Sequence, residues 1–342
     1  MLAWTKKMPS TPVVAVAGAT GAVGREMLLV LEQRNFPASR VVALASSRSA
    51  GKKLPFAGGE LTVEEMTTES FAGVDIALFS AGASISKAMR QAVVDSGCVM
   101  IDNSSAFRMD KDVPLVVPEV NPEDVEWHSG VIANPNCSTI QMVVALKPLD
   151  DMAKIKRVVV STYQAASGAG AAAMEELYSQ SRDFLMGQEL HVENFAHRIA
   201  FNCIPHIDVF LEDGSTKEEW KMVVETQKIM HRPDLEVSAT CVRVPVLRCH
   251  SESINVEFAE PAFLGAAIET LGDADGITLM DDPAGKVYPM PALLEGTDDV
   301  YIGRLRRDDS VQFGLNFWCV ADQLRKGAAL NAVQIAEALL GR

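Results

Sequence analysis

The sequence predicts an α/β protein whose first half is a parallel, doubly wound sheet. A short apolar strand over residues 13–17 runs into a glycine-rich turn and then into a helix with apolar residues at helical spacing. Strands and helices then keep alternating along the first half of the chain, which is typical of a parallel sheet. With 342 residues and 48% hydrophobic content, the chain can bury a sizeable core and form two domains.

Composition narrows the classes of function. The net charge of −14 argues against nucleic acid and anionic membrane surfaces as partners, so an anionic substrate needs a local cluster of Arg and Lys. No apolar run reaches the ~20 residues that span a bilayer, and the leader "MLAWTKKMPSTP" does not resemble a signal peptide. The six cysteines are scattered without a CxxC pair, which favours a reduced, cytoplasmic setting. We expect no metal site.

The turn after the first strand has the pattern of a dinucleotide site. In "GATGAVG", small residues let the backbone approach a pyrophosphate, and the following helix offers the positive end of its dipole. Such a glycine set alone is weak evidence, but here it follows a strand and opens a helix. The residues expected at the cofactor are Gly18, Thr20, Gly21, Ala22, Val23 and Gly24.

The second strand, over 40–46, ends in "SSRSAGK". A site that prefers NAD usually carries an acidic residue at this point, to bind the ribose hydroxyls. This chain offers Arg48 and Ser49, with further hydroxyls before them and lysines after them. A guanidinium and hydroxyls suit a 2′-phosphate, so the sequence favours NADP. The alternative interpretation is a solvated basic turn.

The next elements continue the pattern. "VDIALFSAG" predicts a strand, "SISKAMRQAVVDSG" a helix with Ser84 as its cap, and "CVMIDNSSAF" another strand with its loop. Ligands of doubly wound sheets lie at the carboxyl ends of the strands, which is where "SAG" and "NSSAFR" fall.

Cys137 stands just ahead of the apolar run "IQMVVALKPL". We expect a helix beginning near Ser138 with Asn136 as candidate cap, so that free backbone N–H groups point toward the thiol. Such groups favour a thiolate and could hold the oxygen of a tetrahedral intermediate. Packing is the competing explanation, because free cysteine is among the most buried residue types.

The second half supplies partners for this thiol. Gln164 lies near the end of an apolar strand, where its amide could orient a carbonyl, and Ser167 and Gly168 in the next loop leave room for a nicotinamide, unless the loop is only a tight turn. His250 could be the base that the thiol needs near neutral pH. Arg243 lies seven residues before it, so the two would face opposite ways in one regular strand. The break around Pro245 could bring both to one cleft.

Eight segments together resemble aspartate-β-semialdehyde dehydrogenase along nearly the whole chain. They are "GATGAVG", "SSRSAGK", "NSSAFRM", "NPNCST", "STYQAASGAG", "EEWKMVVETQKI", "VRVPVLRCHSE" and "LRKGAALNAVQIAE". The resemblance implies a Rossmann-type NADP-binding domain over 1–136 that the C-terminal segment 322–342 completes. It further implies an α+β catalytic and dimerisation domain over 137–321 with a large mixed sheet, and a homodimer.

The resemblance also implies a role for each matching position. Cys137 would form the acyl-thioester and His250 would be the acid/base. Gln164 would position the substrate, Arg243 would hold its carboxylate with a bidentate fork, and Glu218 would meet its ammonium. The phosphate ligands implied are Lys221, Arg108 and Asn103. Many relatives have Asn where this chain has Gln323, a position near the cofactor in the family.

The implied reaction is the reversible conversion of 4-phospho-L-aspartate and NADPH to L-aspartate 4-semialdehyde, phosphate and NADP⁺, a step of lysine, threonine, methionine and diaminopimelate biosynthesis. A reductase of N-acetylglutamyl phosphate would use the same thiol and base, but an acetylated amine would not need the acid at Glu218. A glyceraldehyde-phosphate-type dehydrogenase usually has an acid where "SSRS" stands. A catalytically silent NADP-binding protein would not need thiol, base and anion anchors together.

Overall fold

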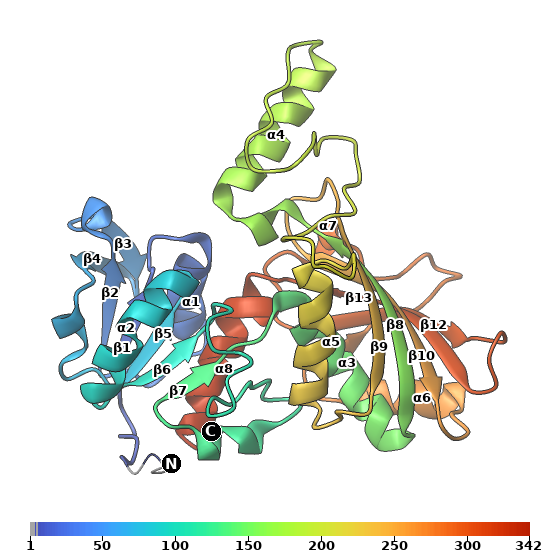
Figure 1. Ribbon diagram of the computed structural model, residues 1–342, viewed down its shortest axis with the longest axis horizontal. Helices are drawn as coiled ribbons and strands as arrows, with labels where there is room; N and C mark the ends of the chain where they lie inside the picture. Colours follow the sequence, from blue (N-terminus) through green and yellow to red (C-terminus); the bar gives the residue numbers. More distant parts are fainter. Residues whose placement is uncertain (1–3, 5) are drawn as a thin grey trace. The chain divides into compact units, whose positions relative to one another are not determined.

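The computed structural model describes Trp4 and residues 6–342, so part of the N-terminal leader lies outside the described residues. The chain forms two compact units (Figure 1). The first comprises Met1–Asn136 and Ala328–Arg342, and the second comprises Cys137–Gly327. The chain therefore returns to the first unit at 328 rather than at 322. No helix in the described part of the chain is long and apolar enough to cross a membrane.

The first unit is built on a seven-stranded sheet in the order β3-β4-β2-β1-β5-β6-β7. All neighbouring strands are parallel except β3 and β4, which form an antiparallel hairpin at the edge. The strands are β1 (Val13–Ala17), β2 (Arg40–Ala45), β3 (Lys53–Phe56), β4 (Gly59–Glu65), β5 (Ile76–Phe79), β6 (Val99–Asp102) and β7 (Val131–Ala133). The parallel, doubly wound arrangement predicted from the alternation of elements is confirmed, and the hairpin is an addition.

Helices α1 (Ala22–Gln33), α2 (Ala83–Asp95) and α8 (Leu330–Leu339) complete this unit, with short turns η1 (Ser47–Ser49), η2 (Thr68–Phe71) and η3 (Pro122–Trp127). The prediction that Ser84 caps α2 is wrong. Gly82 occupies the N-cap position with φ of 90°, a left-handed conformation that costs glycine little. The C-terminal helix α8 buries its apolar residues in the core of this unit, as expected, against α1.

The second unit is built on a six-stranded mixed sheet in the order β11-β12-β13-β10-β8-β9. Its strands are β8 (Ile155–Gln164), β9 (Glu236–Arg243), β10 (His250–Phe258), β11 (Ile277–Leu279), β12 (Val300–Arg307) and β13 (Gly314–Ala321). The central strand β10 is antiparallel to β8 and β13, and β8 is parallel to β9. Strand β8 therefore lies between the two strands that carry Arg243 and His250.

One face of this sheet is covered by helices. They are α3 (Cys137–Met152), α5 (Lys217–Ile229) and α6 (Leu264–Gly272), and α3 contacts both other helices. The short helix α7 (Pro291–Leu294) packs against β13, and the π-helical turn η5 (Arg325–Ala329) follows that strand. Thr162, Glu252 and Cys319 lie side by side on this face and are fully buried, so it forms the core on which the candidate site is built.

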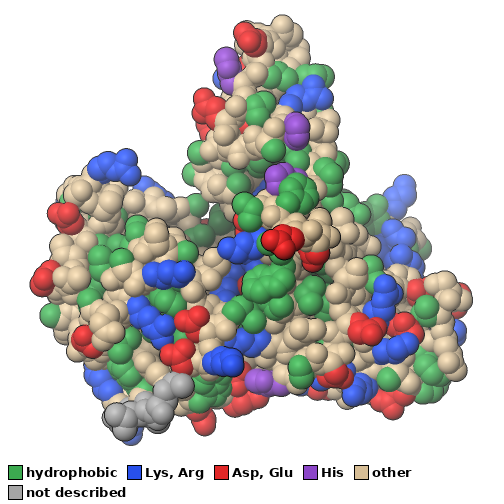
Figure 2. All heavy atoms as spheres, viewed as in Figure 1, with side chains coloured by type: hydrophobic (Ala, Val, Ile, Leu, Met, Phe, Trp, Pro, Cys, Tyr) green, Lys and Arg blue, Asp and Glu red, His purple; other side chains and the backbone are tan. Residues whose placement is uncertain are grey.

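Helix α4 (Ala171–Leu185) follows the turn η4 (Ala166–Ala169) and projects away from the mixed sheet (Figure 1). Hydrophobic side chains are visible among polar ones on this projection in Figure 2. Tyr178, Leu185 and Met186 are 60%, 76% and 64% exposed. Elsewhere on the face drawn in Figure 2, acidic and basic side chains are interspersed.

Candidate active site

Cys137 is the first residue of α3 and is half-buried. The prediction placed the helix start one residue later, near Ser138. On its other side the thiol-bearing residue is approached closely by Gly327, where an added Cβ would lie 2.9 Å from the Cβ of Cys137. Only a residue without a side chain fits at 327 without displacing the cysteine, so the backbone after β13 forms part of the wall around the thiol.

Sheet register brings three predicted residues to one end of the mixed sheet. Gln164 at the end of β8 pairs with Arg243 at the end of β9. On the other side of β8, Tyr163 pairs with Ser251, so His250 begins β10 at the same edge. The loop from 244 to 249 spans β8 and lets Arg243 and His250 face the same side of the sheet. The break around Pro245 thus has the effect that the sequence suggested.

His250 is completely buried. Its Nδ1 accepts a hydrogen bond of 3.1 Å from the backbone N–H of Ala165. Its Nε2 is buried without a hydrogen-bond partner among the described residues. Burial, with a further contribution from the nearby Arg243 guanidinium, lowers the pKa of His250 to about 3. The ring is therefore neutral near pH 7, and its accepting Nδ1 leaves the proton on Nε2.

Arg243 is 7% exposed and donates from Nη1 to the carbonyl of Ala165 at 2.6 Å. Gly168 lies against both this guanidinium and the imidazole. A Cβ added at Gly168 would lie 2.8 Å from Arg243 Nη1 and 3.0 Å from His250 Nε2. The sequence assigned the free space beside Gly168 to a cofactor. In the structure, the lack of a side chain at Gly168 also leaves room for the Arg243 guanidinium and the His250 imidazole.

Glu218 is buried on α5 and links two other predicted residues. Its Oε1 accepts from Gln164 Nε2 at 3.1 Å and its Oε2 accepts from Lys221 Nζ at 2.8 Å. Glu218 and Lys221 are three residues apart and therefore lie on one face of α5. Lys221 also donates to Asp208 at 2.8 Å, a partner that sequence reasoning missed because it comes from an irregular segment. The two carboxylates raise the pKa of Lys221, although its burial opposes them.

Gln323 is 2% exposed, and both ends of its amide bind within the second unit. Its Oε1 accepts from the backbone N–H of Cys249 at 2.8 Å, and its Nε2 donates to the hydroxyl of Ser167. Cys249 has φ of 71°, which is unusual for a residue other than glycine. Gln323 therefore holds the strained residue next to His250. Nothing in the sequence pattern signals this contact, because the two residues are far apart in the chain.

The glycine-rich turn of the first unit packs closely against its neighbours. Gly18 has φ of 87°, and a Cβ added to it would lie 2.4 Å from the carbonyl oxygen of Ser80. A Cβ on Gly24 would lie 2.2 Å from the Gly18 oxygen, so these two glycines allow close packing of strand, turn and helix. Thr20, Ala22 and Val23 belong to the same turn and to the first residues of α1.

The turn η1 carries Arg48 and Ser49 directly after β2. Arg48 is exposed, and the hydroxyl of Ser49 lies 3.5 Å from that of Thr20 in the glycine-rich turn. This contact joins the two predicted parts of the dinucleotide site within the first unit. Residues 46–53 contain no acidic side chain, so the composition of this turn is compatible with a phosphate on the ribose.

Arg108 and Asn103 also lie together in the first unit, in the loop after β6. Arg108 donates to the carbonyls of Asn103 and Asn134 at 2.9 and 3.0 Å. The side-chain oxygen of Asn103 accepts from the Asn134 amide at 2.6 Å. The sequence grouped these two residues with Lys221, which belongs to the second unit.

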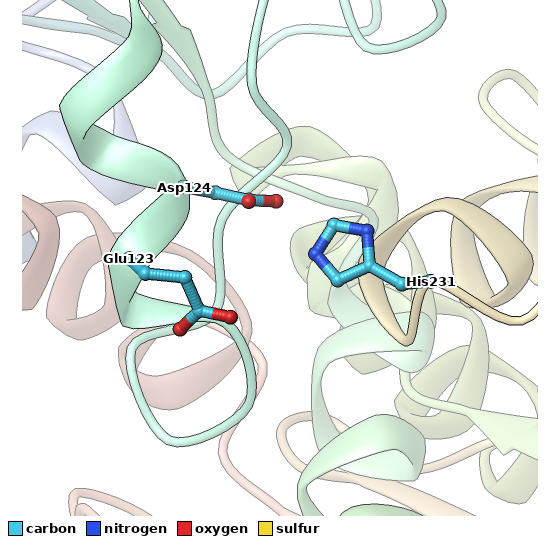
Figure 3. Close-up of side chains that lie close together, drawn as sticks. All are labelled: Glu123, Asp124 and His231. Carbon is cyan, nitrogen blue, oxygen red and sulfur yellow. The ribbon is translucent and has the colours of Figure 1, made fainter.

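Figure 3 shows the neighbouring acids Glu123 and Asp124 on η3, together with His231, which follows α5. Asp124 accepts hydrogen bonds from Asn121 at 2.7 Å and from Trp127 at 3.1 Å, both within the first unit. The Asp124 carboxylate therefore stabilises the η3 turn, and we assign it no role in ligand binding.

The chain matches known families and relatives along most of its length. Residues 13–128 match the family described as "Semialdehyde dehydrogenase, NAD binding domain", and residues 146–326 match "Semialdehyde dehydrogenase, dimerisation domain". An aspartate-semialdehyde dehydrogenase of Aquifex aeolicus is 58% identical over 331 residues, covering 96% of this chain and 97% of the relative. One of Bacillus subtilis is 53% identical over 334 residues, covering 95% and 96%.

Solved structures agree. Aspartate semialdehyde dehydrogenase II of Vibrio cholerae, complexed with ASA, has a TM-score of 0.94 at 46% identity and covers 98% of this chain and 99% of its own. The enzyme of Candida albicans, solved with NADP, has a TM-score of 0.76 at 26% identity and covers 96% and 98%. The fold, the nucleotide-binding domain and relatives along the whole length agree, and the chain belongs to the aspartate-semialdehyde dehydrogenase family.

Proposed function

We propose that the chain reduces 4-phospho-L-aspartate to L-aspartate 4-semialdehyde through a thioester on Cys137, with NADPH as the hydride donor. One observation carries the proposal. In the second unit the Arg243 guanidinium interacts electrostatically with the half-buried Cys137 thiol at the start of α3, and it shares the space beside Gly168 with the buried, neutral His250 imidazole, next to the linked pair Gln164 and Glu218. This set suits acyl transfer to sulfur from a substrate that has both a carboxylate and an ammonium.

In the biosynthetic direction the Cys137 thiolate attacks the acyl carbon, the C–S bond forms, and the C–O bond breaks as phosphate leaves. When bound, NADPH supplies a hydride to the thioester carbon. The resulting tetrahedral oxyanion expels the sulfur as the aldehyde forms. A thioester accepts hydride more readily than an ester because sulfur stabilises its carbonyl less, which is why a cysteine is needed.

His250 enters this scheme as a neutral ring with its proton on Nε2. From this atom it can donate a hydrogen bond that stabilises developing negative charge on oxygen or sulfur, and the proton stays on the ring. The hydrogen bond from Ala165 fixes the ring orientation. Because the pKa of His250 is lowered, this donor stays available without the ring becoming an imidazolium.

Recognition of the substrate falls to Arg243 and Glu218. The free part of the Arg243 fork suits a planar carboxylate. Glu218 is held by Gln164 and Lys221 and offers negative charge to an ammonium. An N-acetylated substrate has no ammonium, so Glu218 argues for the free amino acid over N-acetylglutamyl phosphate. Arg108, Asn103 and Lys221 are the proposed ligands of phosphate.

For the cofactor we propose NADP in preference to NAD. The glycine-rich turn and the start of α1 would hold the pyrophosphate, with Arg48 and Ser49 at the 2′-phosphate. Ser167, which binds Gln323 through its hydroxyl, and Gly168 would lie at the nicotinamide end. The role that the sequence gave to Gln323 at the cofactor becomes an indirect one, because its amide binds Ser167 and Cys249.

We also propose a homodimer formed through the mixed-sheet face opposite α3. Tyr163 is 37% exposed on this face, and Ser253 is exposed beside the half-buried Trp318. An exposed sheet face with aromatic side chains is typical of a surface that a second copy covers. Ser253→Arg would test it, because a charge placed in a twofold contact enters the interface from both copies, so the variant should dissociate in size-exclusion chromatography.

The first experiment is a phosphate-dependence assay. Enzyme, NADP⁺ and aspartate semialdehyde are mixed with and without phosphate, and NADPH absorbance is followed. The assay is repeated with NAD⁺ and with N-acetylglutamate semialdehyde. Phosphate-dependent NADPH formation from the free-amine aldehyde is the expected result. Turnover of only the acetylated aldehyde would overturn the substrate assignment and leave the thiol chemistry intact.

A further inference from the structure

A second polar layer lies directly beneath the candidate site. Gln141 is one helical turn below Cys137 on the same face of α3, and Glu252 is two residues beyond His250 on the same face of β10. Both side chains are 0% exposed. The nucleophile and the base thus each have a polar residue one layer deeper on their own element.

Contacts bring these two deeper residues together. Glu252 is paired across the sheet with Cys319 on β13, and the Sγ of Cys319 lies 3.9 Å from the carbonyl oxygen of Gln141. Helix α3 packs against β13 in the same region. Gln141 therefore stands over the strand pair that carries Glu252.

The buried polar atoms of this layer need hydrogen-bond partners. Both side-chain polar atoms of the Gln141 amide and both carboxyl oxygens of Glu252 are buried, and in the described part of the chain none of the four makes a hydrogen bond of standard geometry. Leaving four such atoms unpaired in a protein interior would be costly. A primary amide and a protonated carboxyl complement each other, since each offers one donor and one acceptor in the same plane.

The electrostatics agree with a protonated carboxyl. Burial raises the pKa of Glu252 well above its usual range, and the Gln141 amide offsets only part of this effect. The neighbouring thiol of Cys319 likewise has its pKa raised by burial and by Glu252. Gln141, Glu252 and Cys319 are therefore all neutral. Thr162, which pairs with Glu252 from β8 on its other side, is neutral as well.

We propose that Gln141 and Glu252 form a neutral amide–carboxyl pair that ties α3 to β10 and so positions Cys137 against His250. The O–H of Glu252 donates to Oε1 of Gln141, and Nε2 of Gln141 donates to the other Glu252 oxygen, which satisfies all four atoms. Both are positioning residues that touch no reactant. The inference rests on the roles proposed above for Cys137 and His250.

The test compares variants of the pair in the full-length enzyme. Glu252→Leu breaks it and leaves Gln141 unpaired. Gln141→Leu with Glu252→Leu removes both polar partners at similar volume, which protects stability while still losing the link. Glu252→Gln keeps a two-bond pair, now between two amides. Ile254→Ala is the matched control, because Ile254 is 1% exposed one layer farther along β10 and lies outside the pair.

Three quantities are measured for each variant: the unfolding temperature, kcat and KM for aspartate semialdehyde, and the pH dependence of Cys137 alkylation by iodoacetamide. We expect the double-leucine variant to remain folded, to lose about tenfold or more in kcat, and to shift the alkylation profile, because near-attack geometry is lost. Glu252→Gln should keep kcat within about threefold and the original profile. Ile254→Ala should lower the unfolding temperature and leave the alkylation profile in place.

Two outcomes would overturn the pair. In one, the folded double-leucine variant keeps the kcat and alkylation profile of the wild type. In the other, Glu252→Gln is as damaging as Glu252→Leu, which would mean that a carboxyl is specifically needed. Cys137→Ser separates this proposal from the proposed function, because retained activity in that variant would instead remove the thiol from the mechanism.

Discussion

The side-chain oxygen of Gln323 accepts a hydrogen bond of 2.8 Å from the backbone N–H of Cys249, the residue that directly precedes the buried imidazole of His250. Cys249 has φ of 71° and no glycine-like freedom to adopt it. The same amide donates to Ser167. A single glutamine after β13 thus supports the start of β10 and the turn η4 that borders it.

We predict that Gln323→Leu lowers kcat by about tenfold to a hundredfold, because one lost buried hydrogen bond costs about 1–3 kcal/mol and here two partners are released. The main effect should fall on kcat, since Cys249 acts through the position of His250. Steady-state kinetics at saturating phosphate provide the measurement.

Gln334→Leu is the matched control for Gln323→Leu. Gln334 donates to Glu119 within the first unit, on the half-buried side of α8. This variant should change kcat little. Equal losses in the two variants would show that Gln323 contributes only general stability.

The cofactor assignment yields a prediction on Arg48. Arg48→Ala should lower kcat/KM for NADP⁺ by about tenfold to a hundredfold, because an arginine that pairs with a phosphate is worth about 1.5–3 kcal/mol. The value for NAD⁺ should hardly change, since NAD⁺ has no 2′-phosphate. The ratio of the two kcat/KM values is measured before and after the change.

Lys53→Ala is the control for Arg48→Ala, because Lys53 is a nearby cation whose Nζ donates to Thr62 across the β3–β4 hairpin. It should leave the NADP⁺ to NAD⁺ ratio unchanged. If Arg48→Ala lowered kcat/KM equally for NADP⁺ and NAD⁺, the residue would act on the pyrophosphate that both cofactors share, or on the fold.

Sequence patterns correctly predicted those elements of the site whose formation depends on residues close together in the chain. Strand β1 and the helix that begins after the glycine-rich turn follow from the spacing of apolar and small residues. The same applies to α3, whose long apolar run begins at the thiol. These patterns depend on neighbours within one or two turns of chain, which a single sequence contains.

Contacts between residues far apart in the chain could not be predicted from the sequence. The placement of β8 between β9 and β10 decides that Arg243 and His250 meet beside Gly168. Strand order depends on pairings between residues that are far apart in the chain, and apolar alternation does not encode it. For the same reason the contacts of Gln323 and the layer below the site were not predicted, since a buried glutamine or glutamate looks like a surface residue in the sequence.

Acid stability provides a further prediction. Burial lowers the pKa of His128 to about 4, and the unfolded chain should titrate this residue near 6.5. Between these values the unfolded state binds more protons than the folded state, so the free energy of unfolding falls as the pH drops from 6.5 toward 4. The contribution of His128 is fully present above pH 6.5 and amounts to on the order of 3 kcal/mol.

His128→Phe isolates this contribution. The ring of His128 lies 5.6 Å from that of Trp4, and phenylalanine keeps an aromatic ring there while removing the titration. Urea unfolding at several pH values gives the slope of the unfolding free energy against pH. Between pH 4 and 6.5 this slope should be smaller in the variant, by the equivalent of up to one bound proton. An unchanged slope would contradict the assignment. His250 adds in the same direction, because its pKa of about 3 is also lowered by burial.

The last prediction concerns the close approach at Gly168. A methyl group there would meet Nη1 of Arg243 at 2.8 Å, a distance that real Cβ atoms essentially never show, and Nε2 of His250 at 3.0 Å, which is tighter than most real contacts. The guanidinium is held by the carbonyl of Ala165, and the ring by the N–H of the same residue, so neither can give way without losing a buried hydrogen bond. Gly168→Ala should therefore lower kcat/KM by about a hundredfold, since a misplacement of about 1 Å has that cost. Gly265→Ala is the matched control, because nothing lies within 4 Å of the added Cβ on α6. That control should keep full activity, and equal activity in both variants would show that the two side chains can shift freely away from η4.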